Sequence, residues 1–200
     1  MNAIDAKINA VAACAEITAG FPLRVAADSL PTGDTYFVQM RNIDSDTGIK
    51  WGETACVSLP TKREPYWLQE GDVLFAARGA KNYAVIVDHP PGKAVCSPHF
   101  FVLRLHDASP VTPEFLAWQI NQKPAQDHFL RNATGSHIPN IRKQVLAELQ
   151  LAVPCHEEQE RIVSLSKAAA KERHIMNRLI EIRIQELEAI ASGLFKRGEA

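Results

Sequence analysis

The chain has 200 residues, of which 46% are hydrophobic and 22% charged, so it can bury a core and is not a disordered tail. Its 22 Lys and Arg balance 23 Asp and Glu, which excludes a uniformly basic arm or acidic tail. No apolar run reaches membrane-spanning length and the first residues do not resemble a signal peptide, so we expect a cytoplasmic protein with no membrane partner. The cysteines are too widely spaced for metal pairs or a dense disulfide framework and are expected to be reduced: Cys14, Cys56, Cys96 and Cys155.

The first half of the chain has short apolar runs separated by turn residues. Residues 35–41 have the β-branched and aromatic composition of a strand, and a polar turn follows at 42–48. Gly71 and Asp72 precede a predicted strand at 73–77. A second apolar run at 83–87 is also predicted to be a strand, and it ends in a turn rich in proline.

The second half adds helices to this pattern. Apolar and polar residues alternate over 101–106 and again over 149–153, which predicts two half-buried strands. Thr112 and Pro113 form a typical helix start, with a hydroxyl cap followed by proline at the first helical position. Further helices are expected from Pro124 and from Pro139. Residues 1–154 are therefore predicted to form an α+β domain that is rich in β-strands in its middle.

A single long helix is predicted from about residue 157 to residue 195, in a separate region spanning 155–200. Acidic residues lie in its first turn and basic residues at its end, as the helix dipole favours. Its apolar stripe is too long for one small domain to cover, so it favours an antiparallel coiled coil between two copies, although packing along its own domain is the alternative. The predicted interface residues recur at three- and four-residue steps: Ile162, Leu165, Ala169, Met176, Leu179, Ile180, Ile184, Leu187, Ala191 and Leu194.

Charge is unevenly distributed along the chain. Residues 1–72 contain six basic and ten acidic side chains, whereas residues 73–143 contain eight basic and four acidic ones. Five of the seven histidines also lie in this basic span. Such a span favours a surface that binds a polyanion, of which nucleic acid is the commonest, although a merely solvated surface has the same composition.

Three segments together resemble the specificity subunits of type I restriction–modification systems. Residues 68–79 are similar to the family's strand containing Gly-Asp, and residues 133–141 are similar to its Gly-Ser segment before a short helix. Residues 151–163 resemble the entry into its long conserved helix, except that His156 replaces the second proline. The order of the three segments carries the resemblance over roughly residues 16–195.

This resemblance implies a target-recognition domain that binds double-stranded DNA, needs no cofactor and performs no chemistry. In the family, a subunit usually contains two such domains, each followed by a helix, and the helices pair antiparallel. Partner subunits carry adenine methylation and ATP-driven translocation and cleavage. The chain contains one domain and one helix, which leaves open a homodimer, a natural half-subunit or a fragment of a longer product.

The candidate DNA contacts come from three polar segments. Arg78, Gly79, Lys81 and Asn82 lie between two predicted strands, where arginine suits guanine, asparagine suits adenine and glycine permits close approach; an ordinary hairpin turn is the alternative. A second loop offers hydroxyls and cations suited to phosphate, although its serine also suits a simple helix cap. A third, weaker candidate lies at the end of the first strand. The members of the last two segments are Ser136, His137, Arg142, Lys143, Arg41 and Asn42.

Catalytic interpretations are less well supported. Residues 88–91 resemble an amino-methyltransferase loop, but His89 interrupts the pattern and no glycine-rich cofactor loop follows a first strand. The acidic residues at 157–160 suit the helix dipole without a metal. The alternatives to DNA recognition are an interaction adaptor that uses the long helix and a metal-dependent nuclease; no catalytic or metal-binding residue is assigned.

Overall fold

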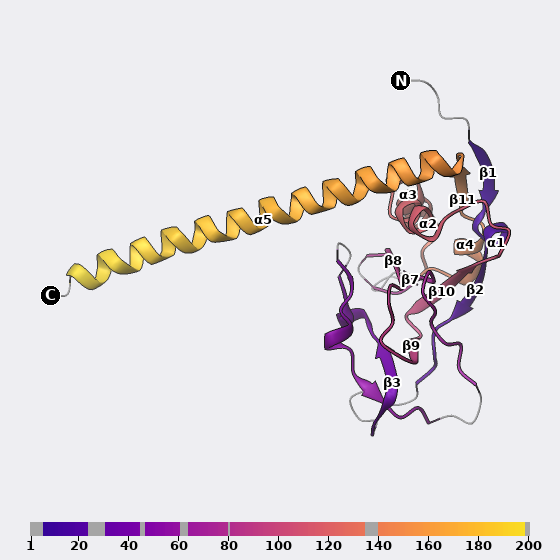
Figure 1. Cartoon of the computed structure of the whole chain (residues 1–200), viewed down its shortest axis with the longest axis horizontal. Coiled ribbons are helices and arrows are strands. Elements are labelled where there is room, and N and C mark those ends of the chain that lie inside the picture. The colour runs from indigo at the N-terminus through magenta and orange to yellow at the C-terminus, as the bar shows by residue number, and fades with distance from the viewer. Residues whose placement is uncertain are drawn as a thin grey trace. The chain divides into compact units, whose positions relative to one another are not determined.

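The computed structural model describes residues 6–23, 31–44, 47–60, 64–79, 81–134 and 140–198 (Figure 1). The chain divides into two units, residues 1–160 and 161–200. Helix α5 (His156–Gly198) begins in the first unit and continues through the second. The predicted division after residue 154 stays a prediction. Two candidate DNA contacts, Ser136 and His137, lie outside the described residues.

A four-stranded antiparallel sheet forms the centre of the first unit. Its order is β2 (Ala15–Ala19), β10 (Phe100–Leu105), β7 (Val73–Ala76) and β8 (Ala84–Ile86). All four residues of β7 are buried, which explains why this segment reads as a continuous apolar run. The strands predicted at 73–77, 83–87 and 101–106 are confirmed to within about one residue at each end.

A smaller mixed sheet contains β6 (Cys56–Val57), β3 (Thr32–Val38) and β9 (Ala94–Cys96), with β3 and β9 parallel. The hairpin of β4 (Ile43–Asp44) and β5 (Gly48–Ile49) follows β3, where a polar turn is predicted. One apolar cluster contains side chains from both sheets, including Val38 of β3 and Leu74 of β7. The two sheets therefore share a core.

The predicted strand at 35–41 is wrong at its C-terminal end. Strand β3 stops at Val38, and Met40–Asn42 form the short 3-10 helix η2. The reason is local hydrogen bonding: the Asn42 side-chain oxygen accepts from Gln39 N at 2.9 Å, and Asn42 N donates to Gln39 O at 2.9 Å. This reciprocal pair closes a turn that strand geometry does not allow. A second 3-10 helix, η3, spans Trp51–Glu53.

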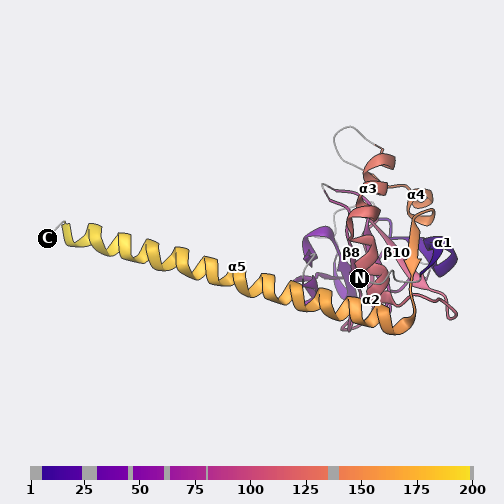
Figure 2. The ribbon, with the colours of Figure 1, turned by 90° about the horizontal axis from the view of Figure 1, so that it is seen from above.

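Helices α2 (Pro113–Ile120) and α3 (Lys123–Asn132) pack on the central sheet. Thr112 caps α2 as predicted, since its hydroxyl oxygen accepts from Phe115 N at 3.2 Å. α2 lies beside β8 (Figure 2), and it also contacts β7 and α3. The ring of Phe129 on α3 lies 4.8 Å from that of Phe75 on β7, centroid to centroid. The buried face of each helix therefore meets the buried face of the sheet.

A two-stranded sheet joins the ends of the first unit. β1 (Lys7–Ala10) pairs antiparallel with β11 (Gln150–Val153), which was predicted as a half-buried strand. The pairing of β1 was not predicted. The short helix α1 (Val11–Cys14) follows β1 and contacts α4 (Lys143–Ala147). As a result, the N-terminal segment is held against the strand that leads into α5.

The helix predicted from Pro139 begins later than expected. Asn140 is extended and bridges both Arg78 and Thr134, and Ile141 N donates to Ala77 O at 2.8 Å. These backbone groups are already bonded to Thr134 and Ala77 in an extended conformation, and the helical turn begins after them. Helix α4 therefore starts at Lys143.

Gln159 anchors the start of α5 within the first unit. Its side chain is fully buried. The amide oxygen accepts from Thr112 N at 3.0 Å, and the amide nitrogen donates to Pro110 O at 2.7 Å and Pro154 O at 3.0 Å. One amide thus joins the first turn of α5 to the loop before α2, which gives Gln159 of the helix-entry segment a structural role.

The described residues contain no helix that is both long and apolar enough to span a membrane. The part of α5 within the second unit exposes large apolar side chains along its length. The exposed side chains include members of the predicted stripe and others outside it: Leu165, Ile175, Met176, Leu179, Ile180, Ile182, Ile184, Leu187, Ile190 and Leu194.

Candidate nucleic-acid interface

The structure brings together two segments that the sequence analysis selected separately. Arg78 follows β7, and Asn140 precedes α4, 62 positions later in the chain. Their backbones form an antiparallel bridge, and Arg78 Nε donates to Asn140 Oδ1 at 3.2 Å. Arg78 is exposed, whereas Ile141 directly after Asn140 is buried. The two loops therefore begin from neighbouring backbone segments that are anchored in the core.

The second loop is also closed on itself at this base. Asn140 N donates to Thr134 O at 2.9 Å, and Thr134 N donates to Asn140 O at 3.1 Å. The Thr134 hydroxyl donates to the same carbonyl at 3.1 Å. Thr134 and Asn140 thus form the neck of the loop.

The first loop has the geometry of a tight connection between β7 and β8. Gly79 has φ of +139°, a backbone conformation that favours glycine. The Asn82 side chain donates to Ala76 O at 2.8 Å, and Ala76 N donates to Tyr83 O at 2.8 Å. Asn82 therefore shapes the turn, while Lys81 is exposed.

The third predicted segment lies next to the first loop. A Cβ placed on Gly79 would lie 3.4 Å from Met40 Cε, and the Tyr83 hydroxyl lies 4.0 Å from Met40 Sδ. Burial raises the pKa of the Tyr83 hydroxyl, and the negative charge of Asp44 raises it further. This group therefore remains protonated at neutral pH.

The two candidates in this third segment have different environments. Arg41 is exposed. Asn42 is only 2% exposed, and its side-chain nitrogen donates to Glu53 O at 2.8 Å. With its oxygen bonded to Gln39 N, Asn42 holds η2 in place, so the structure does not support the prediction that it contacts DNA.

Cations flank the second loop on both sides. Arg142 and Lys143 are exposed at the start of α4, within three residues of Asn140. Arg131, which the sequence analysis missed, is exposed in the last turn of α3, three residues before Thr134. His128 of α3 lies 3.0 Å from Val145 O of α4, which fixes the two helices to each other. The sequence feature that could have identified Arg131 is its position at the end of a helix, directly before the second loop.

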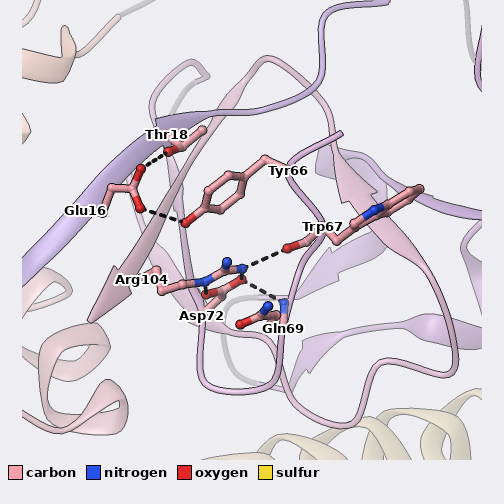
Figure 3. Close-up of polar contacts among 7 residues, drawn as sticks. All are labelled: Glu16, Thr18, Tyr66, Trp67, Gln69, Asp72 and Arg104. Atoms are coloured by element: carbon pink, nitrogen blue, oxygen red, sulfur yellow. Dashed lines mark hydrogen bonds and ion pairs between the residues drawn. The ribbon is translucent and has the colours of Figure 1, made fainter. Parts of the chain in front are cut away.

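A buried ion pair fixes the strand that leads to Arg78 (Figure 3). Asp72, at 2% exposure, accepts from Arg104 Nε at 2.8 Å and from a terminal Arg104 nitrogen at 2.7 Å. It also accepts from Gln69 N at 2.8 Å, and Gly71 beside it has φ of +86°. The Gly-Asp pair of the first motif therefore makes a turn and bonds it to β10.

Aromatic and acidic neighbours complete this cluster. The Arg104 guanidinium lies 4.4 Å from the ring centroid of Tyr66 and donates to Trp67 O at 2.8 Å. The Tyr66 hydroxyl donates to Glu16 of β2 at 3.3 Å. Hydrogen bonding to Asp72 raises the pKa of Arg104, and burial raises the pKa of Tyr66. The cluster joins β2, β10 and the entry to β7, and sequence reasoning identified only its Gly-Asp pair.

No group of three metal-ligating side chains occurs among the described residues. His99 is exposed, and its carbonyl accepts from Ala77 N at 2.9 Å, next to the site. The described residues therefore bring guanidinium, ammonium and amide groups together around the bridge between Arg78 and Asn140. These are the groups that bind phosphates and the edges of bases.

An α+β domain with exposed cations beside two neighbouring loops, followed by a long helix with exposed apolar side chains, is typical of a domain that binds a polyanion and carries a helix suited to pairing. The family model for the type I restriction modification DNA specificity domain matches residues 29–184, and the chain belongs to this family. This agrees with the resemblance carried by the three sequence segments.

Solved structures of specificity subunits have the same fold. The S subunit of a type I restriction-modification system from M. genitalium matches with a TM-score of 0.59 at 16% identity, over 91% of this chain and 43% of that chain. The HsdS subunit from Thermoanaerobacter tengcongensis matches with a TM-score of 0.61 at 20% identity, over 86% of this chain and 44% of that one. The chain thus spans less than half the length of these subunits. No curated protein matches it significantly.

Proposed function

We propose that this protein is a sequence-specific DNA-binding specificity subunit of a type I-like restriction–modification system, in which one recognition domain reads one half of a bipartite target. The observation that carries the proposal is the joining of two loops from distant parts of the basic span through Arg78 and Asn140. The family match supports DNA as the ligand.

The proposed contacts divide into two chemical kinds. We propose that Arg78 reads a base edge, because guanidinium groups pair bidentately with guanine in the major groove. We propose that the exposed Lys81, Arg131, Arg142 and Lys143 contact phosphates, which position the protein without reading sequence. Two loop residues beyond the described part of the chain, Ser136 and His137, and the exposed Arg41 remain in the proposed set.

Assembly is proposed to use α5. The helix has 43 residues and would be about 65 Å long at about 1.5 Å per residue. Antiparallel pairing of two copies would bury the stripe that includes Leu179 and Leu187 and would supply two recognition domains. Such pairing is isologous and implies an inverted-repeat target whose spacer depends on helix length.

The apolar surface of α5 is wider than this pairing needs. Ile175 and Ile182 are seven residues apart and therefore lie on one line, which is offset by about 100° from Met176. A two-stranded seam uses only a narrow stripe. The extra apolar line supports docking of partner subunits, which we propose to be an adenine methyltransferase and a restriction translocase–nuclease. The chain itself is proposed to be non-catalytic.

Selection from a randomised duplex library tests the DNA-binding proposal. The full chain should enrich one sequence, and its affinity should fall steeply with salt as counterions are released. Arg78→Ala should remove preference at one base position and cost about 1–3 kcal/mol on the selected sequence. Lys143→Ala should weaken binding to all sequences about equally, and Lys171→Ala, an exposed lysine of the second unit, serves as the matched control. No enrichment of any sequence, or no binding to duplex DNA, would refute the proposal.

A further inference from the structure

The side chain of Asn140 has a role that its backbone contacts do not explain. Its N–H and carbonyl close the neck of the second loop with Thr134, and its bridge to Arg78 also involves the backbone. The side-chain oxygen is directed elsewhere, to Arg78 Nε at 3.2 Å. Truncating this side chain would therefore leave the backbone bonds of the loop in place.

The hydrogen bond to Nε decides which part of the guanidinium is available. Nε carries one of the five N–H donors of arginine, and the remaining donors lie on the two terminal nitrogens in a planar fork. Within the described part of the chain, Arg78 makes its polar contact with Asn140 alone. The terminal nitrogens are thus left to meet O6 and N7 of a guanine end-on.

The contact also restricts a flexible side chain before binding. Arg78 is exposed and long, so an untethered guanidinium would sample many rotamers and lose that freedom on DNA. Asn140 is half-buried and forms the closed neck with Thr134, and the next residue, Ile141, is fully buried. The acceptor is therefore fixed to the core, and it fixes the donor.

We propose that Asn140 is a positioning residue for specificity: it holds Arg78 so that the terminal guanidinium nitrogens read one guanine of the half-site. This rests on the proposed DNA-binding function and adds to it the base that is read and the residue that orients the reader. Arg78 would touch the base, whereas Asn140 would act through Arg78.

The test is a double-mutant cycle on the full chain, with duplexes that differ at single positions of the selected sequence. Arg78→Ala and Asn140→Ala should reduce discrimination at the same position, and that position should be a guanine. Asn140→Ala should weaken binding to the duplex with guanine at this position by about 2- to 12-fold, which is the cost of immobilising one long side chain. It should have little effect on binding to the duplexes with another base there. On an Arg78→Ala background, Asn140→Ala should cause no further loss of discrimination.

Two variants separate positioning from loop stability. Asn140→Asp keeps an oxygen acceptor for Nε, so it should retain the guanine preference while weakening all duplexes by phosphate repulsion. Thr134→Val removes the hydroxyl bond to the Asn140 carbonyl without touching Arg78, and it should leave base preference unchanged. Thermal unfolding of each variant checks folding. If Asn140→Ala does not fold, Asn140→Ser, whose shorter side chain does not reach Nε, replaces it in the cycle.

The outcomes are distinguishable. Three results would overturn the role of Asn140 and leave DNA recognition intact. Asn140→Ala would weaken binding to all duplexes equally, or it would reduce discrimination at another position than Arg78→Ala does. The third result is that the losses of the two single variants add up in the double variant. A wild-type chain that binds duplex DNA without any base preference, or does not bind it, would overturn the proposed function as well.

Discussion

Removing the Asp72 carboxylate tests how strongly the ion pair with Arg104 stabilises the first unit. Asp72 is 2% exposed and receives two hydrogen bonds from Arg104 and one from Gln69 N. In Asp72→Ala, the guanidinium loses both bonds and its counter-ion, although it keeps Trp67 O and the Tyr66 ring. The variant therefore leaves a partly buried charge without its main partner.

The expected cost follows from this geometry. Breaking a buried ion pair by removing one partner costs about 3–5 kcal/mol. The Arg104 side chain is 28% exposed and retains two contacts, so we expect the lower end, about 3 kcal/mol of unfolding free energy. For a domain of this size, each kcal/mol lowers the midpoint of thermal unfolding by about 2–4 °C, which gives about 6–12 °C.

Urea unfolding of wild type, Asp72→Ala, Arg104→Met and the double variant measures both the loss and the coupling. The two side chains should be coupled by about 2–3 kcal/mol, because each single variant strands the other partner. Glu70→Ala is the matched control: its carboxylate pairs with His89 at 2.9 Å on the surface, and its loss should change stability negligibly. A loss of unfolding free energy below about 1 kcal/mol for Asp72→Ala, or losses in the two single variants that add up to the loss in the double variant, would show that the ion pair does not stabilise the first unit.

Three other predictions concern the helix and the core. Gln159→Leu leaves the backbone groups of the loop before α2 unpaired, and it should lower the unfolding free energy of the first unit by about 2–4 kcal/mol in urea unfolding. The exposed Gln185→Leu is the control, and a loss no larger than in this variant would contradict the anchoring role of Gln159. Charged residues in place of Leu179 and Leu187 should convert a homodimer to a monomer in sedimentation, and a wild-type monomer of 22.1 kDa at tens of micromolar would exclude self-pairing. Burial raises the pKa of Cys96 to about 12, so above pH 9 the unfolded thiol loses its proton while the folded one keeps it. Stability should therefore fall as pH rises from 9 towards 12, by about 1.4 kcal/mol per unit more than in Cys96→Ala, and parallel pH curves for the two proteins would contradict this.

Residue order alone determined the features that depend on near neighbours. The three- and four-residue apolar steps after Pro154 predicted a long helix, and α5 indeed runs over His156–Gly198. Thr112 and Pro113 marked the start of α2 because capping involves residues three positions apart. The polar and basic loops at 78–82 and 133–143 were also visible, since side-chain type and turn residues are local properties.

The tertiary structure decided which of these segments meet. Thr134, Asn140 and Arg78 form one neck, yet the sequence gives no measure of a contact across 62 positions. The same contacts delayed α4 to Lys143, because backbone groups engaged by another strand cannot start a helix.

Burial likewise depends on the whole fold. Asn42 was predicted to contact DNA, and the sequence assigned Gln159 no contact. Packing encloses both, and each becomes a hydrogen-bonded anchor because a buried amide must satisfy its donors and acceptors. Asp72 was selected for its motif, whereas its partner Arg104, on a strand 32 positions away, was found only through the antiparallel pairing of β7 and β10. Local periodicity thus specified the elements of this protein, and long-range strand pairing and burial specified which side chains form its proposed recognition surface and which support it.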